Sequence, residues 1–410
     1  MKSIFIKIFS LSILVLSFNN GCHNPVEPKL QVQSNIPQWG MFMHDARHTG
    51  NVNTPVEGIT GPSGDSVTAK WRIPIDGGLI GSPAIGSDGT IYIGTDNQNR
   101  SDSCSVYAIN PDGTIKWRYT PIPSIWSSPA IGNDGSIYVG TLLDVDGGGG
   151  LYALSSNGML KWIHNPGENI ISSPAIGKDG TVYYTNKDYL VALNSADGSA
   201  KWQLQDGDYY CSPAISSDGT IYYSSYGTIT AVNPNGNIKW TYDDSSYAKQ
   251  HVFGIEIGND GSIYFVSSDS PFLYALDSKG KLKWKYSIGN FGVDPCLDTK
   301  GDIYAVTTSY MLLSINSTGN LEWESSLPIT TGNLNSPLVI DNNGVEYIGV
   351  SGLIIKEPAL LAYNQKDLIW SFGAGYPYND GSITAAPTLY NGSLYFAWDS
   401  GEYYYFYCLQ

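Results

Sequence analysis

Short apolar runs separated by glycine turns fill the chain from about residue 66 onward. A typical run is Thr90–Gly94, in which β-branched and aromatic residues follow the Asp88-Gly89 pair. Asp-Gly pairs supply the positive φ angles of a tight hairpin, and β-branched and aromatic residues favour strands. A Ser-Pro-Ala phrase, as at 82–84, stands before many of the turns, and proline is tolerated at the start of a strand. No window has convincing helical periodicity, so the pattern predicts an all-β chain.

The pattern repeats about every 40 residues, which is the period of a propeller blade or a solenoid unit. Each unit has four expected strands: A after the Ser-Pro-Ala phrase, B after a glycine turn, C after a variable loop, and D after a second glycine turn. Looser forms of the opening phrase stand at 253–255, 294–296, 336–338 and 386–388. Strand D carries a tryptophan in every unit. These are Trp71, Trp117, Trp162, Trp202, Trp240, Trp284, Trp323 and Trp370.

The two ends of the repeat array are incomplete in complementary ways. Trp71 precedes the first Ser-Pro-Ala phrase, so no strand A, B or C stands before it. The last unit ends at 406–410, in a segment that corresponds to strand C, and lacks its own strand D. We therefore expect residues near 66–73 to pair with the C-terminal strand and close a ring, which removes most of the exposed sheet edge. The sequence predicts an eight-bladed β-propeller with four antiparallel strands per blade.

The repeat resembles that of the pyrroloquinoline-quinone-type propellers. Their signature, Ala-x-Asp-x-x-Thr-Gly-x-x-x-Trp, keeps its spacing at Ala192, Asn194, Gly198 and Trp202, and most other units are one residue shorter. The resemblance runs from about residue 37 to the end and implies that the tryptophans dock between blades. The family includes quinoprotein dehydrogenases and the propeller lipoprotein of the outer-membrane β-barrel assembly machinery. Because the family has members with different functions, the resemblance predicts the fold specifically but gives little information about activity.

The N-terminus is typical of an exported protein. Two lysines precede the apolar run 8–18, which is too short for a convincing membrane span. Gly21-Cys22 follows, and a small residue before cysteine is similar to a bacterial lipoprotein cleavage site, although Asn19 stands where that motif prefers leucine. Ordinary cleavage nearby, with no role for Cys22, is the alternative.

These features predict three parts and a compartment. Residues 1–22 are expected to be a signal peptide with lipidation at Cys22, residues 23–36 a tether, and residues 37–410 a single propeller. The expected location is the bacterial cell envelope, on the periplasmic side or at the cell surface.

Charge and cysteine positions narrow the function. The net charge of −15 argues against nucleic-acid binding, which needs a basic footprint. Export permits disulfides, but Cys211, Cys296 and Cys408 fall where other repeats carry Ser or Ala and are expected to be small core residues. Cys104 is expected in a longer loop. The sequence has no adjacent Cys-Cys pair, which quinoprotein alcohol dehydrogenases usually carry at their cofactor.

Strand alternation divides the connections between two faces of the ring. The A–B and C–D connections are tight turns on one face, whereas the B–C and D–A connections share the other face and vary in length. Function concentrates in loops on rigid scaffolds, and tyrosine and tryptophan dominate interface hot spots. We call this second face the loop-rich face, and its candidate binding residues are Trp126, Tyr209, Tyr210, Tyr247, Phe291, Tyr376, Tyr378 and Trp398. The alternative for each residue is that tyrosine, with 30 copies, is simply a frequent strand and loop residue here.

Two patterns have metal-ligand side chains in incomplete settings. His44, Asp45 and His48 are candidate ligands, but a histidine pair at this spacing needs a helix, and the segment 39–50 is too short and polar for one. We favour a structural role in which this segment packs on the ring. The Asp-Val-Asp sequence at 144–146 begins like a calcium loop, but the further oxygen ligands and the glutamate are missing, so a flexible hairpin tip is favoured.

The family resemblance also sets out what a quinone-dependent dehydrogenase needs: a calcium ion held by Glu, Asn and Asp, a catalytic aspartate, and a tryptophan beneath the quinone. No position marks these residues, and no HExxH, GxSxG or phosphate loop occurs. We predict a monomeric, non-catalytic scaffold with no cofactor or metal. It would bind an envelope protein through the loop-rich face and meet the membrane only through a lipid anchor. Glycan or cell-wall polymer binding is the first alternative, and a quinone-dependent dehydrogenase is the second.

Overall fold

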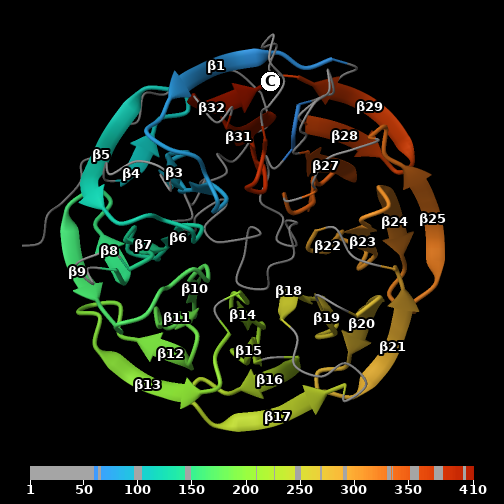
Figure 1. The fold of residues 1–410 in the computed structure, drawn as a ribbon, viewed down its shortest axis with the longest axis horizontal. Helices are drawn as coiled ribbons and strands as arrows, with labels where there is room; N and C mark the ends of the chain where they lie inside the picture. Colours follow the sequence, from blue (N-terminus) through green and yellow to red (C-terminus); the bar gives the residue numbers. More distant parts are fainter. Residues whose placement is uncertain are drawn as a thin grey trace, which may run out of the picture. The chain divides into compact units, whose positions relative to one another are not determined.

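Eight four-stranded antiparallel sheets stand around a common centre in the computed structural model (Figure 1). The chain divides into residues 1–34 and 35–410, and every described residue belongs to the second unit. No helix that is long and apolar enough to cross a membrane occurs among the described residues. The structure describes residues 60–62, 66–96, 104–143, 149–208, 210–225, 227–244, 251–267, 270–289, 293–329, 334, 336–350, 360–373, 382–399 and 403–410.

Blades 1 to 4 follow one another along the chain, and strands A to D run from the centre of the ring outward. Blade 1 consists of β2 (Ala84–Ile85), β3 (Ile91–Gly94), β4 (Cys104–Ile109) and β5 (Ile115–Ile122). Blade 2 consists of β6 (Ala130–Ile131), β7 (Ile137–Gly140), β8 (Leu151–Leu154) and β9 (Leu160–His164). Blade 3 consists of β10 (Ala175–Ile176), β11 (Val182–Thr185), β12 (Tyr189–Leu193) and β13 (Ala200–Gln205). Blade 4 consists of β14 (Ala214–Ile215), β15 (Ile221–Ser225), β16 (Thr228–Val232) and β17 (Ile238–Asp243).

Blades 5 to 7 continue this order, and blade 8 takes its outer strand from the other end of the array. Blade 5 consists of β18 (Val252–Ile257), β19 (Ile263–Ser267), β20 (Phe272–Leu276) and β21 (Leu282–Ser287). Blade 6 consists of β22 (Cys296–Leu297), β23 (Ile303–Val306), β24 (Met311–Ile315) and β25 (Leu321–Ser326). Blade 7 consists of β26 (Val339–Ile340), β27 (Val345–Gly349), β28 (Leu360–Asn364) and β29 (Asp367–Phe372). Blade 8 consists of β30 (Thr388–Tyr390), β31 (Ser393–Asp399), β32 (Tyr404–Leu409) and β1 (Ala69–Pro74).

The predicted ring closure is confirmed. Strand β1 pairs antiparallel with β32, and Trp71 lies opposite Cys408. Two backbone hydrogen bonds extend this pairing, from the Thr68 amide to the Gln410 carbonyl at 3.1 Å and from the Gln410 amide to the Thr68 carbonyl at 3.0 Å. The first tryptophan of the sequence therefore belongs to the last blade.

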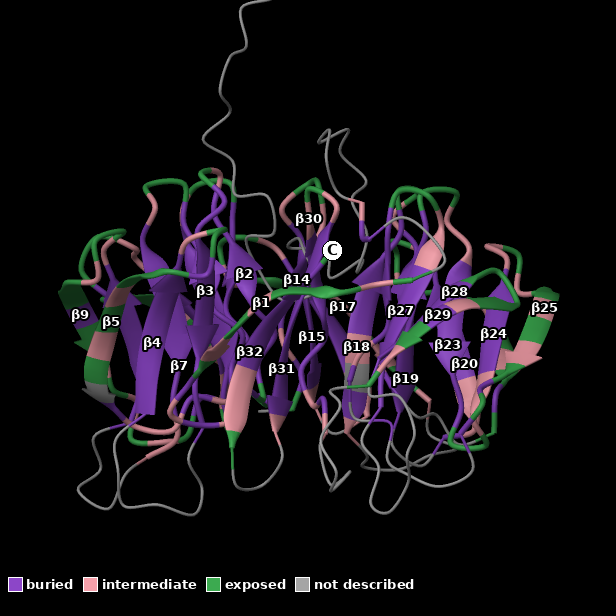
Figure 2. Cartoon of the chain, turned by 90° about the horizontal axis from the view of Figure 1, so that it is seen from above, coloured by how far each residue is buried: buried purple, intermediate pink, exposed green. Residues whose placement is uncertain are grey.

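Burial changes along each blade (Figure 2). The B and C strands are buried almost throughout, because each is covered by the neighbouring blades on both sides. The outer D strands alternate between exposed and half-buried positions, as in β13. Period-2 alternation therefore marks only the outer strand of this fold.

Four details of the sequence prediction can be compared with the structure. Cys211, Cys296 and Cys408 are buried free thiols in core positions, as expected. Cys104 is not in a loop: it opens strand β4, which begins earlier than predicted, and is 3% exposed. The opening phrases at 253–255 and 336–338 are shifted by one residue, because Glu256 and Val339 occupy the position of Ala84 opposite the strand-B tyrosine.

Each strand-D tryptophan packs against the strand-B tyrosine of its own blade, and the eight pairs have ring centroids 5.7–5.9 Å apart. In six blades the indole Nε1 also donates a hydrogen bond of 2.9–3.0 Å to a carbonyl in the C–D turn of the next blade. The turn glycine makes room for the ring: a Cβ on Gly236 would lie 2.9 Å from the Trp202 indole. The six are Trp71, Trp117, Trp162, Trp202, Trp240 and Trp284. Trp323 and Trp370 make no such bond to a described residue.

A second contact between blades lies near the centre. The hydroxyl of each serine in the Ser-Pro-Ala phrase accepts a hydrogen bond from the backbone amide at the same position of the preceding blade. The Ser82 amide thus donates to Ser128 at 2.8 Å, and the Ser128 amide donates to Ser173 at 2.9 Å. The bond from Ala386 to Ser82, at 3.0 Å, carries this belt across the ring closure from blade 8 to blade 1.

Candidate functional site

On the loop-rich face, the side chains of Asp208, Tyr210 and His251 interact with one another. Tyr210 follows β13, is 45% exposed, and lies edge-on to the His251 ring with centroids 4.6 Å apart. His251 immediately precedes β18, and its Nδ1 lies 2.9 Å from Oδ2 of the buried Asp208. The connections before blades 4 and 5 thus meet at an imidazole that a buried carboxylate orients and an exposed phenol ring covers.

The other candidate binding residues of the loop-rich face do not belong to this group. Trp126 is half-buried in the β5–β6 connection, and its buried Nε1 has no hydrogen-bond partner among the described residues. The prediction that Trp398 lies in a loop is wrong: β31 extends through Asp399, Trp398 pairs with Tyr405 inside the sheet, and only 4% of it is exposed. The remaining candidates lie outside the described residues. They are Tyr209, Tyr247, Phe291, Tyr376 and Tyr378.

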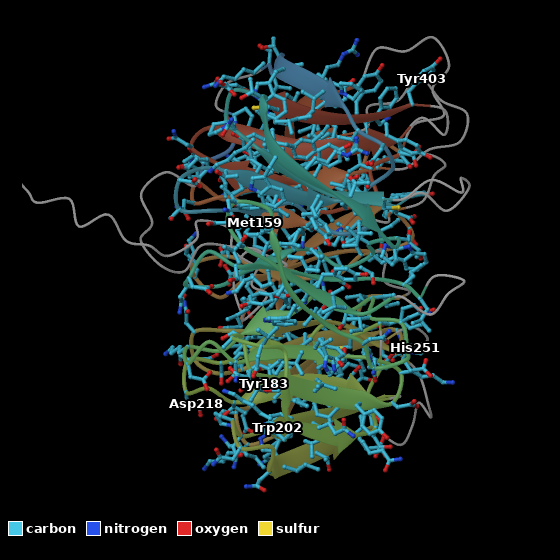
Figure 3. The ribbon with its side chains drawn as sticks, turned by 90° about the vertical axis from the view of Figure 1, so that its left-hand side faces the viewer. Met159, Tyr183, Trp202, Asp218, His251 and Tyr403 are labelled. Carbon is cyan, nitrogen blue, oxygen red and sulfur yellow. The ribbon has the colours of Figure 1, made fainter. Side chains whose placement is uncertain are left out.

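One exposed aromatic residue on this face was missed. Tyr403 stands just before β32 and is 54% exposed. Figure 3 shows Tyr403 and His251 toward one rim of the ring, and Asp218, from the A–B turn of blade 4, toward the opposite rim. The run of three consecutive tyrosines at 403–405 was the available signal, because it lies where the variable B–C connection meets strand C.

A cluster of polar groups around the Asp76 carboxylate, near the loop-rich face, connects blade 8 with blade 1. Asp76, which follows β1, accepts hydrogen bonds from the hydroxyls of Thr95 and Ser105 and pairs with Arg118, all in blade 1. The Arg118 guanidinium also lies 5.2 Å from the centre of the Tyr107 ring. Burial, aided by the Asp76 carboxylate, raises the pKa of Tyr107 to about 12. These groups are fully engaged in holding blades 8 and 1 together.

The opposite face carries a repeated ion pair. In five A–B turns an aspartate caps its own turn and binds a strand-D lysine of the same blade. Asp88 accepts from the Thr90 amide at 3.0 Å and from the Lys116 ammonium at 2.9 Å. Burial alone would raise the pKa of Asp88, but the bonds from Lys116 and Thr90 outweigh it and lower the pKa. The five pairs are Asp88–Lys116, Asp134–Lys161, Asp179–Lys201, Asp218–Lys239 and Asp260–Lys283.

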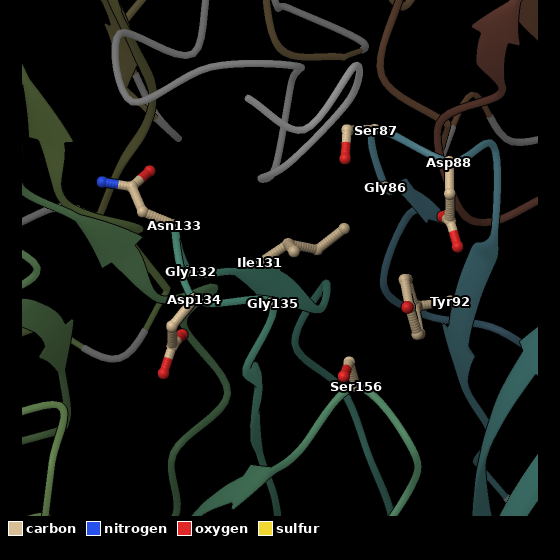
Figure 4. A pocket seen from close by; sticks show the side chains of 10 residues that line it. All are labelled: Gly86, Ser87, Asp88, Tyr92, Ile131, Gly132, Asn133, Asp134, Gly135 and Ser156. Carbon is tan, nitrogen blue, oxygen red and sulfur yellow. The ribbon is translucent and has the colours of Figure 1, made fainter. Parts of the chain in front are cut away.

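A pocket of about 400 Å³ lies between the A–B turns of blades 1 and 2 (Figure 4). Ser87 and Asp88 line it from blade 1, and Asn133 and Asp134 line it from blade 2. Ser156, from the C–D turn of blade 2, adds a hydroxyl. The Tyr92 ring and Ile131 complete the lining, so neighbouring repeats form a pocket with both polar and apolar walls.

Two carboxyl groups lie inside the stacked blades. Glu256 in β18 and Glu346 in β27 are both 0% exposed. Burial raises the pKa of Glu346 to about 9, so this side chain is neutral at pH 7. Burial, followed by the nearby Glu256 and Glu346 carboxyl groups, also raises the pKa of the Cys296 thiol. Neither glutamate was singled out from the sequence.

In the part of the chain that the structure describes, no group of three or more His, Cys, Asp or Glu side chains could hold a metal ion. The segments 39–50 and 144–146, with their candidate ligands, lie outside the described residues.

Comparison with known proteins gave one family and several related folds. Residues 102–243 and 225–345 match the model of a protein family described as outer membrane protein assembly factor BamB. No curated protein matches the sequence significantly. The structure of BamB from Moraxella catarrhalis matches with a TM-score of 0.66 and 17% identity, covering 84% of this chain and 100% of that chain. The structure of virginiamycin B lyase from Staphylococcus aureus matches with a TM-score of 0.51 and 14% identity, covering 84% and 99%. At these identities the solved structures establish a shared fold alone.

Proposed function

Since this chain belongs to the family of the outer membrane protein assembly factor BamB, we propose that it is a non-catalytic scaffold of the bacterial cell envelope that binds a protein partner through its loop-rich face. The observation that carries the proposal is the group formed by Asp208, Tyr210 and His251. The buried Asp208 carboxylate fixes the imidazole, and the imidazole edge supports an exposed tyrosine ring.

Such a group suits protein recognition for a physical reason. A tyrosine that is already held in place loses little side-chain freedom when a partner covers it, so more of the contact energy remains as affinity. Tyrosine is also among the residues that dominate interface energetics. Tyr403 adds a second exposed ring on the same face.

Site-specific photocrosslinking in living bacteria tests the partner. A photoreactive phenylalanine analogue at Tyr210 or Tyr403 is expected to capture the same envelope protein. The matched control is the same analogue at Ile238, which is 56% exposed but opens the outer strand β17 of blade 4 next to its C–D turn. Adducts that are absent at Tyr210 and Tyr403, or equally abundant at Ile238, would refute a partner on the loop-rich face.

The proposed anchor is a lipid on Cys22, with residues 23–36 as the tether. Its support is the leader-like apolar run and the Gly21-Cys22 sequence. Cells that are fed a labelled fatty acid should label the full chain and not the Cys22→Ala variant. Equal labelling of both chains, or an unlabelled wild type, would exclude this anchor.

Glycan or cell-wall polymer binding is the second candidate, because the exposed rings of Tyr210 and Tyr403 also suit stacking on sugars. Purified protein would then sediment with isolated cell-wall polymer, and Tyr210→Ala would abolish this. Under the scaffold proposal we expect no sedimentation. We likewise expect no quinone absorbance and no dye-linked dehydrogenase activity when the protein is incubated with the quinone and calcium. The likeness to the lyase rests on the shared ring and transfers no activity to this chain.

A further inference from the structure

One lysine bridges two A–B turns. Lys178, in the A–B turn of blade 3, donates a hydrogen bond from its ammonium to the backbone carbonyl of Ser217, in the A–B turn of blade 4, at 2.7 Å. The bond joins neighbouring blades on the face opposite the loop-rich face. It shows which chemical group fits between two such turns.

The strand registers identify the corresponding residues at the interface between blades 1 and 2. Ala84, Ala130, Ala175 and Ala214 each lie opposite the strand-B tyrosine of their own blade. Three residues after these alanines stand Ser87, Asn133, Lys178 and Ser217. Ser87 therefore occupies the place of Lys178, and the Asn133 carbonyl occupies the place of the Ser217 carbonyl.

The space that a lysine would fill at this interface is the pocket of about 400 Å³ (Figure 4). Its volume is ample for one long side chain, and no backbone amide among the described residues donates to the Asn133 carbonyl. The Asp88 and Asp134 carboxylates line the pocket, and each already holds its own lysine at 2.9 Å. The local carboxylates are thus compensated, while the chain as a whole carries a net charge of −15, which attracts cations.

We propose that the pocket between the A–B turns of blades 1 and 2 receives a lysine side chain of a partner protein, whose ammonium donates to the Asn133 carbonyl as Lys178 donates to Ser217. This inference depends on the proposed function in one respect: the lysine is taken to belong to a protein partner. It adds a contact on the face away from Tyr210. A partner that uses both sites would have to reach around the rim of the ring.

Two reciprocal variants test lysine binding in this pocket without any partner protein. The probe is Nα-acetyl-lysine methylamide, and the readout is the amide NMR shifts of Gly132, Asn133 and Gly135 in the purified propeller. Saturable shifts are expected, with binding at least about tenfold tighter than that of the uncharged norleucine analogue. In Ser87→Lys the chain supplies its own ammonium, so binding should weaken at least about tenfold. In Lys178→Ser the Ser217 carbonyl loses its ammonium donor, so the probe should bind there too and cause a second set of shifts at Ser217.

Three results would overturn the inference. The first is a lysine probe that causes no shifts, or shifts no larger than those of the norleucine analogue. The second is unchanged binding by Ser87→Lys. The third is binding of free spermidine without binding of the lysine probe, since this would assign the pocket to a free amine. Because the assay contains no partner protein, its failure is distinguishable from failure of the crosslinking at Tyr210, which tests the proposed function.

Discussion

Blades 1 to 4 and blades 6 and 7 have the same four strands but hold their A–B turns differently. In blade 1 the capping carboxylate is Asp88, at the tip of the turn, and it also binds a lysine on the outer strand. In blade 6 the turn tip is Lys300, and the cap is Asp298, two residues earlier, which accepts from the Lys300 and Asp302 amides at 2.9 Å. Asp341 caps the turn of blade 7 in the same way.

The two kinds of turn differ at the residue two positions before the tip. Blade 1 has Gly86 at the position of Asp298, and a Cβ there would lie 3.0 Å from the Asp88 carboxylate. The cap at the tip is exposed and compensated by lysine, whereas Asp298 and Asp341 are buried beside the hydroxyls of Tyr304 and Tyr347. Each A–B turn of blades 1 to 7 has a carboxylate that accepts from a turn amide, because unpaired backbone amides are costly. In blade 8 the Gly392 amide donates to the Thr60 carbonyl instead. The position of the carboxylate in the sequence is free to change.

Blades 6 and 7 depart from blades 1 to 4 in other places as well. The serine of the inner belt is replaced by Asp294 in blade 6 and by Pro337 in blade 7. The C–D turn of blade 7 is shorter and has Gln365 at a φ of 57° in place of a turn glycine. Trp323, which faces this turn, makes no indole hydrogen bond to a described residue. The serine belt therefore runs from blade 8 to blade 4, and the indole hydrogen bonds run from blade 8 to blade 6.

The largest effect is expected at the ring closure, which neither group of blades can replace. A chain that lacks residues 1–74 loses β1 and exposes the whole edge of β32, so cooperative unfolding should be lost or the melting temperature should fall sharply. A chain that lacks only residues 1–34 keeps β1 and should melt as the full chain does. Calorimetry on both chains decides this. An unchanged melting temperature for the shorter chain would disprove closure through β1.

The next effect compares two turn glycines. Gly236 has a φ of +84° and lies under Trp202, whereas Gly344 has a φ of +78° and no atom within 4 Å of the place where a Cβ would stand. Gly236→Ala should cost about 3 kcal/mol, from backbone strain and a clash with the indole, and Gly344→Ala about 1 kcal/mol, from strain alone. Urea denaturation measures both values. Equal losses of stability in the two variants would mean that Gly236 is needed only for its positive φ angle and not to make room for the indole.

A third effect separates the two groups of blades by pH. The raised pKa of Glu346 means that the folded state holds this proton more tightly than the unfolded chain. The resulting stabilisation is complete below the ordinary value of 4.5 and is lost as the pH rises through about 9. Asp88, Asp134 and Asp179 have lowered pKa values, so their contribution is present above 3.8 and is lost as the pH falls through the lowered values.

Glu346→Ile tests this difference, since the corresponding residue of blade 1 is Ile91. The variant should be more stable at pH 8 by on the order of 2 kcal/mol and should lose most of the decline in melting temperature between pH 5 and 9. Glu346→Gln is the control that keeps the size and removes the charge. Melting temperatures across this pH range provide the measurement, and a decline that persists in both variants would exclude Glu346 as its source.

The smallest effect compares two tryptophans. Trp202→Phe removes the 2.9 Å hydrogen bond to the Pro234 carbonyl, while Trp323→Phe removes no bond of this kind to a described residue. Both lose indole area, so the first variant should be less stable than the second by about 1 kcal/mol. Equal stabilities in urea would mean that the bond between blades contributes nothing net.

The repeat period, the glycine turns and the unpaired first tryptophan were enough to predict eight blades and their closure. Prediction failed where a residue's environment depends on neighbouring blades. Val345-Glu346-Tyr347 looks like an alternating strand with its glutamate in water, but B strands are covered on both sides, so the glutamate is buried. Trp398 failed for a related reason, because β31 continues past the point where the other B strands end.

The candidate site was less predictable than the fold. Asp208 and His251 are 43 residues apart, and only the course of two connections brings them together. The aromatic composition of those connections indicated the face, but no periodic pattern specifies which rings remain exposed. The proposed occupant of the pocket between blades 1 and 2 likewise depends on the strand register, which aligns Ser87 with Lys178.

The hydrogen bonds between Thr68 and Gln410 place the two ends of the repeat array next to each other. A linker between these two residues would turn residues 68–410 into a continuous circle, and new ends could then be opened at any exposed turn that lies between two blades. Chains opened between two of blades 1 to 4, or between blades 6 and 7, would keep every strand pairing and differ only in which two blades the new ends separate.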